Sequence, residues 1–204
     1  MYHYMDYFKL FMCLRVVLAI VVLYYLPIPL TAKILLIMFF DNIDGRFVKR
    51  LGIHNHDHTL TKEYQLHDKI ADLLGYIIVL HYLYREKVFE EGKLMILSTV
   101  LVYRLIGDYI FFKEKNRKVL FYFPNIYEKL VLLWAIFNDT GLNVDKYVEV
   151  LIIIFITMFK TYHEFFLHYS DDNHKGFKPI FGKFLKGKMP VMDFLKVFKK
   201  TYIY

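Results

Sequence analysis

The stretch FFDNIDGR at residues 39–46 is the most informative part of this sequence for the fold. An apolar run ends there, and two aspartates follow at helical spacing. Asp41 and Asp44 are three positions apart, and Asp68 and Asp72, which open the next apolar run, are four positions apart. Both spacings place the two carboxylates of a pair on one face of an α-helix. We therefore expect two neighbouring antiparallel helices whose four carboxylates converge at the same end.

The apolar residues are gathered into long runs, which is typical of a membrane protein. The 204 residues are 57% hydrophobic and 19% aromatic, and the mean hydropathy is +0.32. A helix that spans a bilayer needs about 20 mostly apolar residues. The sequence predicts an all-α membrane protein with six transmembrane helices near Phe8–Leu26, Ile28–Phe40, Leu73–Leu83, Leu94–Phe112, Val119–Phe137 and Val148–Phe159.

The second and third runs reach a spanning length only if their helices include the acidic stretches. The second helix would then continue through residues 41–50, and the third would begin at Asp68. The first run is expected to be a retained helix rather than a secretory signal, because Arg15 interrupts it and no small-residue cleavage site follows Pro27. Cys13 is the single cysteine, so neither an intrachain disulfide nor a thiolate metal cluster is expected.

Basic residues are unevenly distributed among the connections, as expected of cytoplasmic and non-cytoplasmic loops. The connections after the second and fourth runs are rich in lysine and arginine, and the others are uncharged, acidic or balanced. The basic residues of the two rich connections are Arg46, Lys49, Arg50 and Lys62, and Lys113, Lys115, Arg117 and Lys118. The pattern predicts six spans with both termini in the cytoplasm, so the net charge of +7 indicates topology rather than nucleic-acid binding.

A single domain is expected over residues 1–204, since the sequence has no internal repeat and no linker. Interfacial segments are expected at both ends of the chain. The C-terminal one, residues 174–204, interleaves lysines with apolar residues. This pattern predicts an amphipathic helix on the anionic inner leaflet, and a solvated tail is the alternative.

The four aspartates are candidates for a metal site at the cytoplasmic edge of the bilayer. Clustered like charges are unfavourable there unless cations neutralise them. Carboxylate oxygens without cysteine favour Mg²⁺, Mn²⁺ or Ca²⁺ over Zn²⁺. Gly45 supports this interpretation, because a residue without Cβ lets a ligand approach the backbone. The alternative is a set of helix-end acids, with Asp68 capping its helix and Asp41 paired with Arg46 or Lys49.

Three histidines, His54, His56 and His58, alternate in the loop between the two acidic stretches. Alternation places them on one side of an extended segment. Apart from His67, however, no second ligand cluster with metal spacing accompanies them. We interpret the three as the tip of a loop rather than as a zinc site.

The acidic stretches resemble the signature of the CDP-alcohol phosphotransferase family, Asp-x2-Asp-Gly-x2-Ala-Arg-x8-Gly-x3-Asp-x3-Asp, which lies on the second and third of six membrane helices. Asp41, Asp44, Gly45, Asp68 and Asp72 match it. The resemblance implies transfer of a phosphatidyl group from CDP-diacylglycerol, or of a related group from another CDP-alcohol, to a small alcohol with release of CMP. It also implies a two-metal site of Mg²⁺ or Mn²⁺ held by the four aspartates, Asp72 as the general base, and a homodimer.

The chain departs from that signature at three positions. Val48 and Lys49 stand where the pattern has Ala and Arg, and Tyr64 stands where it has Gly. Lys49 or Arg50 is therefore expected to join Gly45 in binding the nucleotide phosphates. The bulkier side chains, and an inserted loop between the acidic stretches, motivate an alternative function. In it the chain is a catalytically inactive membrane protein that keeps the fold and has a structural or partner-binding role.

Inositol or glycerol phosphate is the expected acceptor, because many members that use CDP-diacylglycerol take one of them and basic residues are expected around the cavity. Arg104, Lys129 and Lys160 are the candidate contacts for an acceptor phosphate. Arg104 and Asp108 are four positions apart and are expected to pair with each other. Arg15 is expected to extend to the membrane interface. An ion transporter is less favoured, because the acids lie on one side rather than at the midplane.

Overall fold

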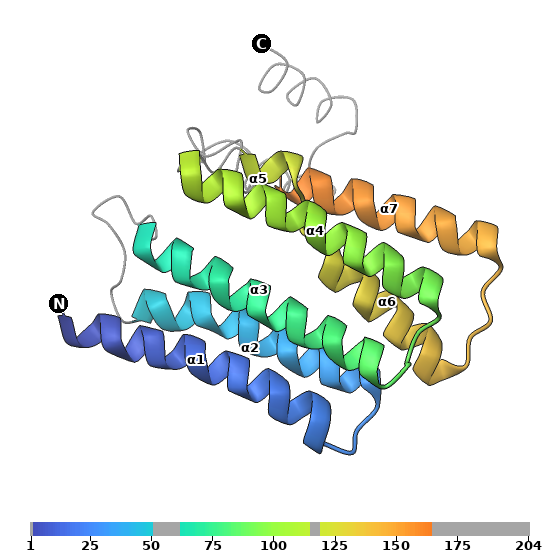
Figure 1. The fold of residues 1–204 in the computed structure, drawn as a ribbon, viewed down its shortest axis with the longest axis horizontal. Helices are drawn as coiled ribbons and strands as arrows, with labels where there is room; N and C mark the ends of the chain where they lie inside the picture. The colour runs from blue at the N-terminus through green and yellow to red at the C-terminus, as the bar shows by residue number, and fades with distance from the viewer. Residues whose placement is uncertain (1, 51–61, 115–118, 165–204) are drawn as a thin grey trace, which may run out of the picture.

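The structure is a computed structural model that describes residues 2–50, 62–114 and 119–164. Every regular element in these ranges is an α-helix, which confirms the predicted all-α class for the part described. Figure 1 shows the long helices lying side by side, with successive long helices running in opposite directions along the horizontal axis. They are α1 (Tyr2–Tyr25), α2 (Leu30–Arg50), α3 (Lys62–Arg85), α4 (Glu91–Glu114), α5 (Val119–Tyr122), α6 (Tyr127–Thr140) and α7 (Lys146–Glu164).

Helices α2 and α3 both include the acidic stretches, as the sequence predicted. Helix α2 continues past its apolar run to Arg50, as expected, whereas α3 begins at Lys62, six residues before the expected start at Asp68. They are 21 and 24 residues long. At a rise of about 1.5 Å per residue, each is long enough to cross a bilayer.

The fifth predicted helix is not continuous, which differs from the expectation of one span over Val119–Phe137. Helix α5 has only four residues, and α6 begins at Tyr127 after a turn that contains Pro124. Proline has no N–H to donate and its ring clashes with the preceding helical turn, so it ends a helix. The turn packs closely on α4, because a Cβ added to Gly107 would lie 2.3 Å from Phe123 Cβ.

Two side chains of α6 join it to neighbouring helices, Asp139 near its C-terminal end and Trp134 near its middle. The backbone N–H of Thr31, in the first turn of α2, donates to Asp139 Oδ2 at 2.6 Å. The indole N–H of Trp134 donates to Glu149 Oε1 on α7 at 2.5 Å. Helix α6 then ends at Gly141, whose φ of 65° is left-handed and favours glycine.

The buried core lies between α1, α2, α3, α4 and α6, where α1 packs against both α2 and α3, and α6 packs against α2 and α4. Its largest fully buried side chains include Leu23, Leu83, Leu97, Tyr127 and Trp134. The outward faces are also apolar. Among the exposed large apolar side chains are Leu10, Leu14, Val17, Tyr25, Leu35, Phe39, Tyr84, Met95, Val102, Tyr109, Leu151, Phe155, Met158 and Phe159. Exposed apolar side chains in this number are consistent with a membrane protein.

Two helical stretches in the described ranges are long and apolar enough to cross a membrane: Glu91–Glu114, and Val119–Thr140 across the turn at Pro124. The finding is weakly consistent with a membrane protein. The count of six spans and the cytoplasmic termini stay predictions. The basic tail at 174–204 and the histidines at 54–58 lie outside the described residues.

Candidate metal centre

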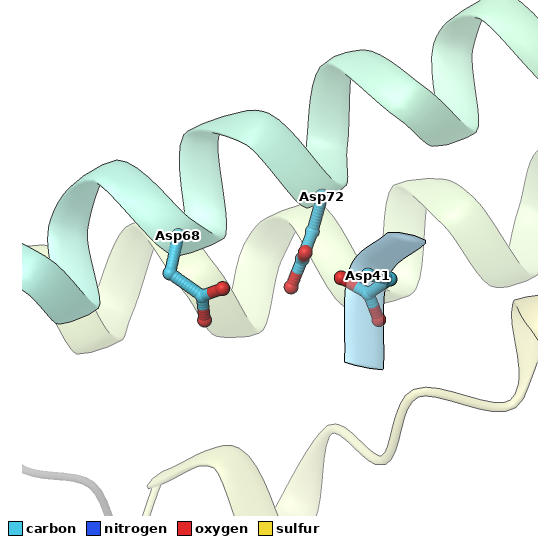
Figure 2. Close-up of side chains that lie close together, drawn as sticks. All are labelled: Asp41, Asp68 and Asp72. Atoms are coloured by element: carbon cyan, nitrogen blue, oxygen red, sulfur yellow. The ribbon is translucent and has the colours of Figure 1, made fainter. Parts of the chain in front are cut away.

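Three of the four aspartates converge. Asp41 projects from α2, and Asp68 and Asp72 project from one face of α3 toward it, as Figure 2 shows. One carboxylate oxygen of each lies within 4.8 Å of the others. The three side chains are 30%, 17% and 11% exposed, respectively, so each is partly shielded from water. Asp44 lies one turn further along α2, and its side chain is outside the described part of the chain.

The side chain of Arg15 inserts among these carboxylates, which corrects the expectation that it extends to the membrane interface. It is only 9% exposed. Its guanidinium forms ion pairs with Asp41, with Asp72 Oδ1 at 2.9 Å and with Asp68 Oδ1 at 3.5 Å. Helix α1 packs against both α2 and α3, which places Arg15 opposite both. An arginine inside an apolar run is costly without a partner, and that cost was the available signal.

Lys69 is a second cation that the sequence reasoning did not single out. Its ammonium lies 3.1 Å from Asp68 Oδ2 and 2.8 Å from Asp72 Oδ2. The spacing of Lys69 and Asp72, three positions apart on a helix, was the signal for this pair. Both oxygens of Asp72 are therefore held by cations, Oδ1 by Arg15 and Oδ2 by Lys69.

The donor set matches what Mg²⁺ or Mn²⁺ prefers, since it consists of carboxylate oxygens from two helices at short mutual distances. Arg15 and Lys69 meet the same oxygens, so a divalent ion would compete with them. With all three carboxylates ionised, the cluster would carry one negative charge more than Arg15 and Lys69 neutralise, and this charge would attract a further cation. The residues present therefore fit a divalent ion, provided that Arg15 can withdraw.

Two of the basic residues predicted to contact an acceptor phosphate, Arg104 and Lys129, have other partners among the described residues. Arg104 is buried on α4, where it pairs with Asp108 Oδ1 at 3.2 Å and donates to the carbonyl of Phe123 at 2.5 Å. This confirms the expected pair of Arg104 and Asp108. Lys129 is 38% exposed and approaches Glu128 Oε2 at 3.8 Å. Lys160 is partly buried near the end of α7.

The residues predicted to bind the nucleotide, Gly45, Lys49 and Arg50, lie in the last turns of α2. Their side-chain positions, like those of Val48 and Tyr64, are outside the described part of the structure. Whether Tyr64 narrows a nucleotide pocket therefore stays a prediction.

A cavity of about 50 Å³ adjoins the cluster, between α1, α2, α3 and α6. Its polar wall is formed by Arg15, Asp41, Asp72, Tyr76 and Glu128. The rest of the wall is apolar and includes Val16, Ala19, Ile34, Ile37, Met38, Val79 and Val131.

Comparison of the chain with protein-family models, with curated proteins and with solved structures finds no match.

Proposed function

We propose that the protein is a CDP-alcohol phosphatidyltransferase of phospholipid biosynthesis, which transfers a phosphatidyl group from CDP-diacylglycerol to a small alcohol and releases CMP. The observation that carries the proposal is the convergence of Asp41, Asp68 and Asp72 from α2 and α3. These are three of the aspartates that match the signature of that family. Their meeting in space at one end of two antiparallel helices is what a shared metal site requires.

The membrane part of the proposal rests on the outer surface of the helices. Large apolar side chains remain exposed along α1, α4 and α7, while charged side chains such as Lys33, Arg104 and Asp108 are buried. This distribution suits a hydrocarbon solvent, in which charged groups face the interior of the bundle. We propose six spans, both termini and the metal centre on the cytoplasmic side, and a homodimer as the family resemblance implies.

Asp41, Asp44, Asp68 and Asp72 would hold the metal ions in this proposal. Bound Mg²⁺ or Mn²⁺ would neutralise the pyrophosphate of the donor and the charge on the departing CMP. Asp72 would accept the proton of the acceptor hydroxyl as the bond from oxygen to phosphorus forms and the bond to CMP breaks. Since both oxygens of Asp72 are paired with cations, Arg15 has to leave Oδ1 before Asp72 can act as a base.

The test is an activity measurement on the full-length protein in lipid vesicles with CDP-diacylglycerol, Mn²⁺ or Mg²⁺, and a panel of alcohols. We expect CMP to appear only when donor, divalent ion and a suitable acceptor are all present. Asp72→Asn is expected to lower the rate at least a hundredfold, which is the usual contribution of a general base. Folded protein that releases no CMP with any acceptor would contradict the proposal.

A second candidate is favoured by the ion pairs of Arg15 and Lys69. In an inactive protein of the same fold, both cations would stay paired with the carboxylates permanently, and Arg15 would hold α1 to α2 and α3. The two candidates differ in ligand binding. The enzyme should gain thermal stability from CDP together with Mn²⁺, because a ligand that binds the folded state stabilises it by mass action. The inactive protein should gain none.

A further inference from the structure

Lys69 joins the two aspartates of its own helix, α3, through one oxygen of each. Its ammonium nitrogen lies 3.1 Å from Asp68 Oδ2 and 2.8 Å from Asp72 Oδ2. Lys69 follows Asp68 directly and precedes Asp72 by three positions, so all three side chains leave α3 within little more than one turn. The ammonium therefore accompanies the two carboxylates wherever α3 presents them.

The remaining oxygens of these carboxylates meet a different cation, the guanidinium of Arg15. Asp72 Oδ1 lies 2.9 Å from it, and Asp68 Oδ1 lies 3.5 Å from it. Asp41 Oδ1 on α2 pairs with the same guanidinium. Three Oδ1 atoms thus converge on Arg15, and two Oδ2 atoms converge on Lys69. Asp68 and Asp72 are shared between the two cations, with one oxygen of each on either side.

A pair of cations that share carboxylates is also the arrangement of a two-metal site, where the ions lie about 3.5–4 Å apart. The family resemblance implies such a site. In this chain, however, the Oδ2 atoms that a second ion would need are held by Lys69. An ammonium and a divalent ion on the same shielded oxygens would repel each other strongly. The oxygens that face Arg15 therefore suit a divalent ion, and those that face Lys69 do not.

The two cations differ in how readily they can leave. Arg15 belongs to α1, 57 positions from Asp72, so its place depends on the packing of α1 against α2 and α3. Lys69 is tethered to the same turn of α3 as its partners. Its ammonium is a compact point charge with three donors, which suits a place between two carboxylates. Lys69 is therefore the cation that stays when Arg15 withdraws.

The charge balance also favours one divalent ion. With Asp41, Asp68 and Asp72 ionised, Lys69 and one divalent ion together neutralise the three described carboxylates. A second divalent ion would leave two positive charges in excess on these oxygens. Uncompensated charge in a shielded site is unfavourable.

We propose that Lys69 is a built-in cation of the metal centre and takes the place of one of the two ions that the family resemblance implies, so that the protein binds a single divalent ion. The proposal rests on the transferase function proposed above and concerns the same site. Lys69 acts as a positioning residue, because it holds Oδ2 of Asp68 and Asp72 and leaves Oδ1 of each for the ion.

The test counts bound manganese and does not depend on activity. Full-length protein in phosphatidylcholine nanodiscs is stripped with EDTA, dialysed and titrated with Mn²⁺, and the free ion is measured by electron paramagnetic resonance. We expect the wild type to bind one Mn²⁺ per chain. Lys69→Met removes the ammonium, keeps a side chain of similar length and should bind two. The two ions should give an exchange-coupled signal that the single ion lacks.

Matched variants separate the charge of Lys69 from a general effect on the fold. Lys69→Arg keeps a cation beside the carboxylates and should bind one Mn²⁺ per chain. Lys93→Met is the control, because Lys93 lies near the start of α4, where it approaches Glu149 Oε1 at 3.9 Å, and it should also bind one. Lys69→Gln replaces Lys69→Met if the latter does not fold, since its neutral amide can still donate to a carboxylate, and it should bind two.

The counts decide the proposal. A wild type that binds two Mn²⁺ per chain, or none, would overturn it, and so would a single ion in a folded Lys69→Met or Lys69→Gln protein.

The same counts separate this inference from the proposed function. One ion in the wild type and two in Lys69→Met, without CMP release from CDP-diacylglycerol, would support the role of Lys69 and contradict the transferase. CMP release by a wild type that holds two ions would support the transferase and contradict the role of Lys69.

Discussion

Replacement of Arg15 by glutamine tests how the carboxylate cluster is neutralised. Arg15 pairs with Asp41, with Asp72 at 2.9 Å and with Asp68 at 3.5 Å, and its side chain is 9% exposed. Removing one partner from a buried ion pair costs about 3–5 kcal/mol, because the remaining charge stays buried and uncompensated. In a solution containing EDTA, we therefore expect Arg15→Gln to unfold at a clearly lower temperature than the wild type.

Divalent ions should reverse much of this loss. A guanidinium and a divalent ion 4 Å apart repel by about 8 kcal/mol at an effective dielectric constant of about 20, so Arg15 opposes an incoming Mn²⁺ strongly. Removing about a sixth of that repulsion strengthens Mn²⁺ binding about tenfold. The expected result is that Mn²⁺ stabilises Arg15→Gln more than it stabilises the wild type, with a dissociation constant at least tenfold lower.

Thermal unfolding with EDTA or Mn²⁺, and Mn²⁺ binding followed by electron paramagnetic resonance, measure the two effects. Lys33→Gln is the matched control, because Lys33 is also a buried cation but bonds to the Leu23 carbonyl and the Tyr82 hydroxyl. It should lose stability without any change in Mn²⁺ affinity. An Arg15→Gln protein that is as stable as the wild type in EDTA, or that binds Mn²⁺ no more tightly, would refute the competition between Arg15 and the metal.

Three further predictions follow from particular contacts. Gly107→Ala should lower the unfolding temperature, because its Cβ would lie 2.3 Å from Phe123 Cβ. Gly92→Ala is the control, since a Cβ at Gly92 meets nothing within 4 Å, and it should not lower the unfolding temperature. Equal unfolding midpoints for the two variants would refute the close packing at Gly107. Glu149→Ala removes the acceptor of the Trp134 indole N–H and should accelerate amide hydrogen exchange in the first turn of α7, and unchanged exchange would count against that contact. Asp68→Asn should weaken Mn²⁺ binding at least tenfold. Asp139→Asn changes an aspartate outside the cluster and should leave Mn²⁺ binding unchanged. Equal Mn²⁺ affinities of the two variants would contradict the metal assignment.

The acidic stretches could be placed from the sequence because they interrupt apolar runs at helical spacing. The extension of α2 and α3 through these stretches, and the approach of Asp41 to Asp68 and Asp72, follow from that spacing and from the need for helices of spanning length. The pair of Arg104 and Asp108 was likewise predictable, because both lie on one face of one helix.

Contacts between distant helices could not be predicted in the same way. Arg15 is 26 positions from Asp41 and 57 from Asp72, and its apolar neighbours gave no indication of which helix α1 would face. The cavity wall formed by Tyr76 and Glu128, 52 positions apart, depends on the same packing. The break in the fifth apolar run was predictable from Pro124, because proline ends a helix. Mean hydropathy over a run of about 20 residues does not reveal it, because one proline changes that mean very little.

The most direct test of the central claim is CMP release from CDP-diacylglycerol by the purified full-length protein in lipid vesicles, measured with and without Mn²⁺, for the wild type and Asp72→Asn. We expect the wild type to release CMP only with Mn²⁺ and an alcohol acceptor, and Asp72→Asn to be at least a hundredfold slower while unfolding at a comparable temperature. Equal rates for the two proteins, or no CMP from a wild type that is folded and binds Mn²⁺, would contradict it.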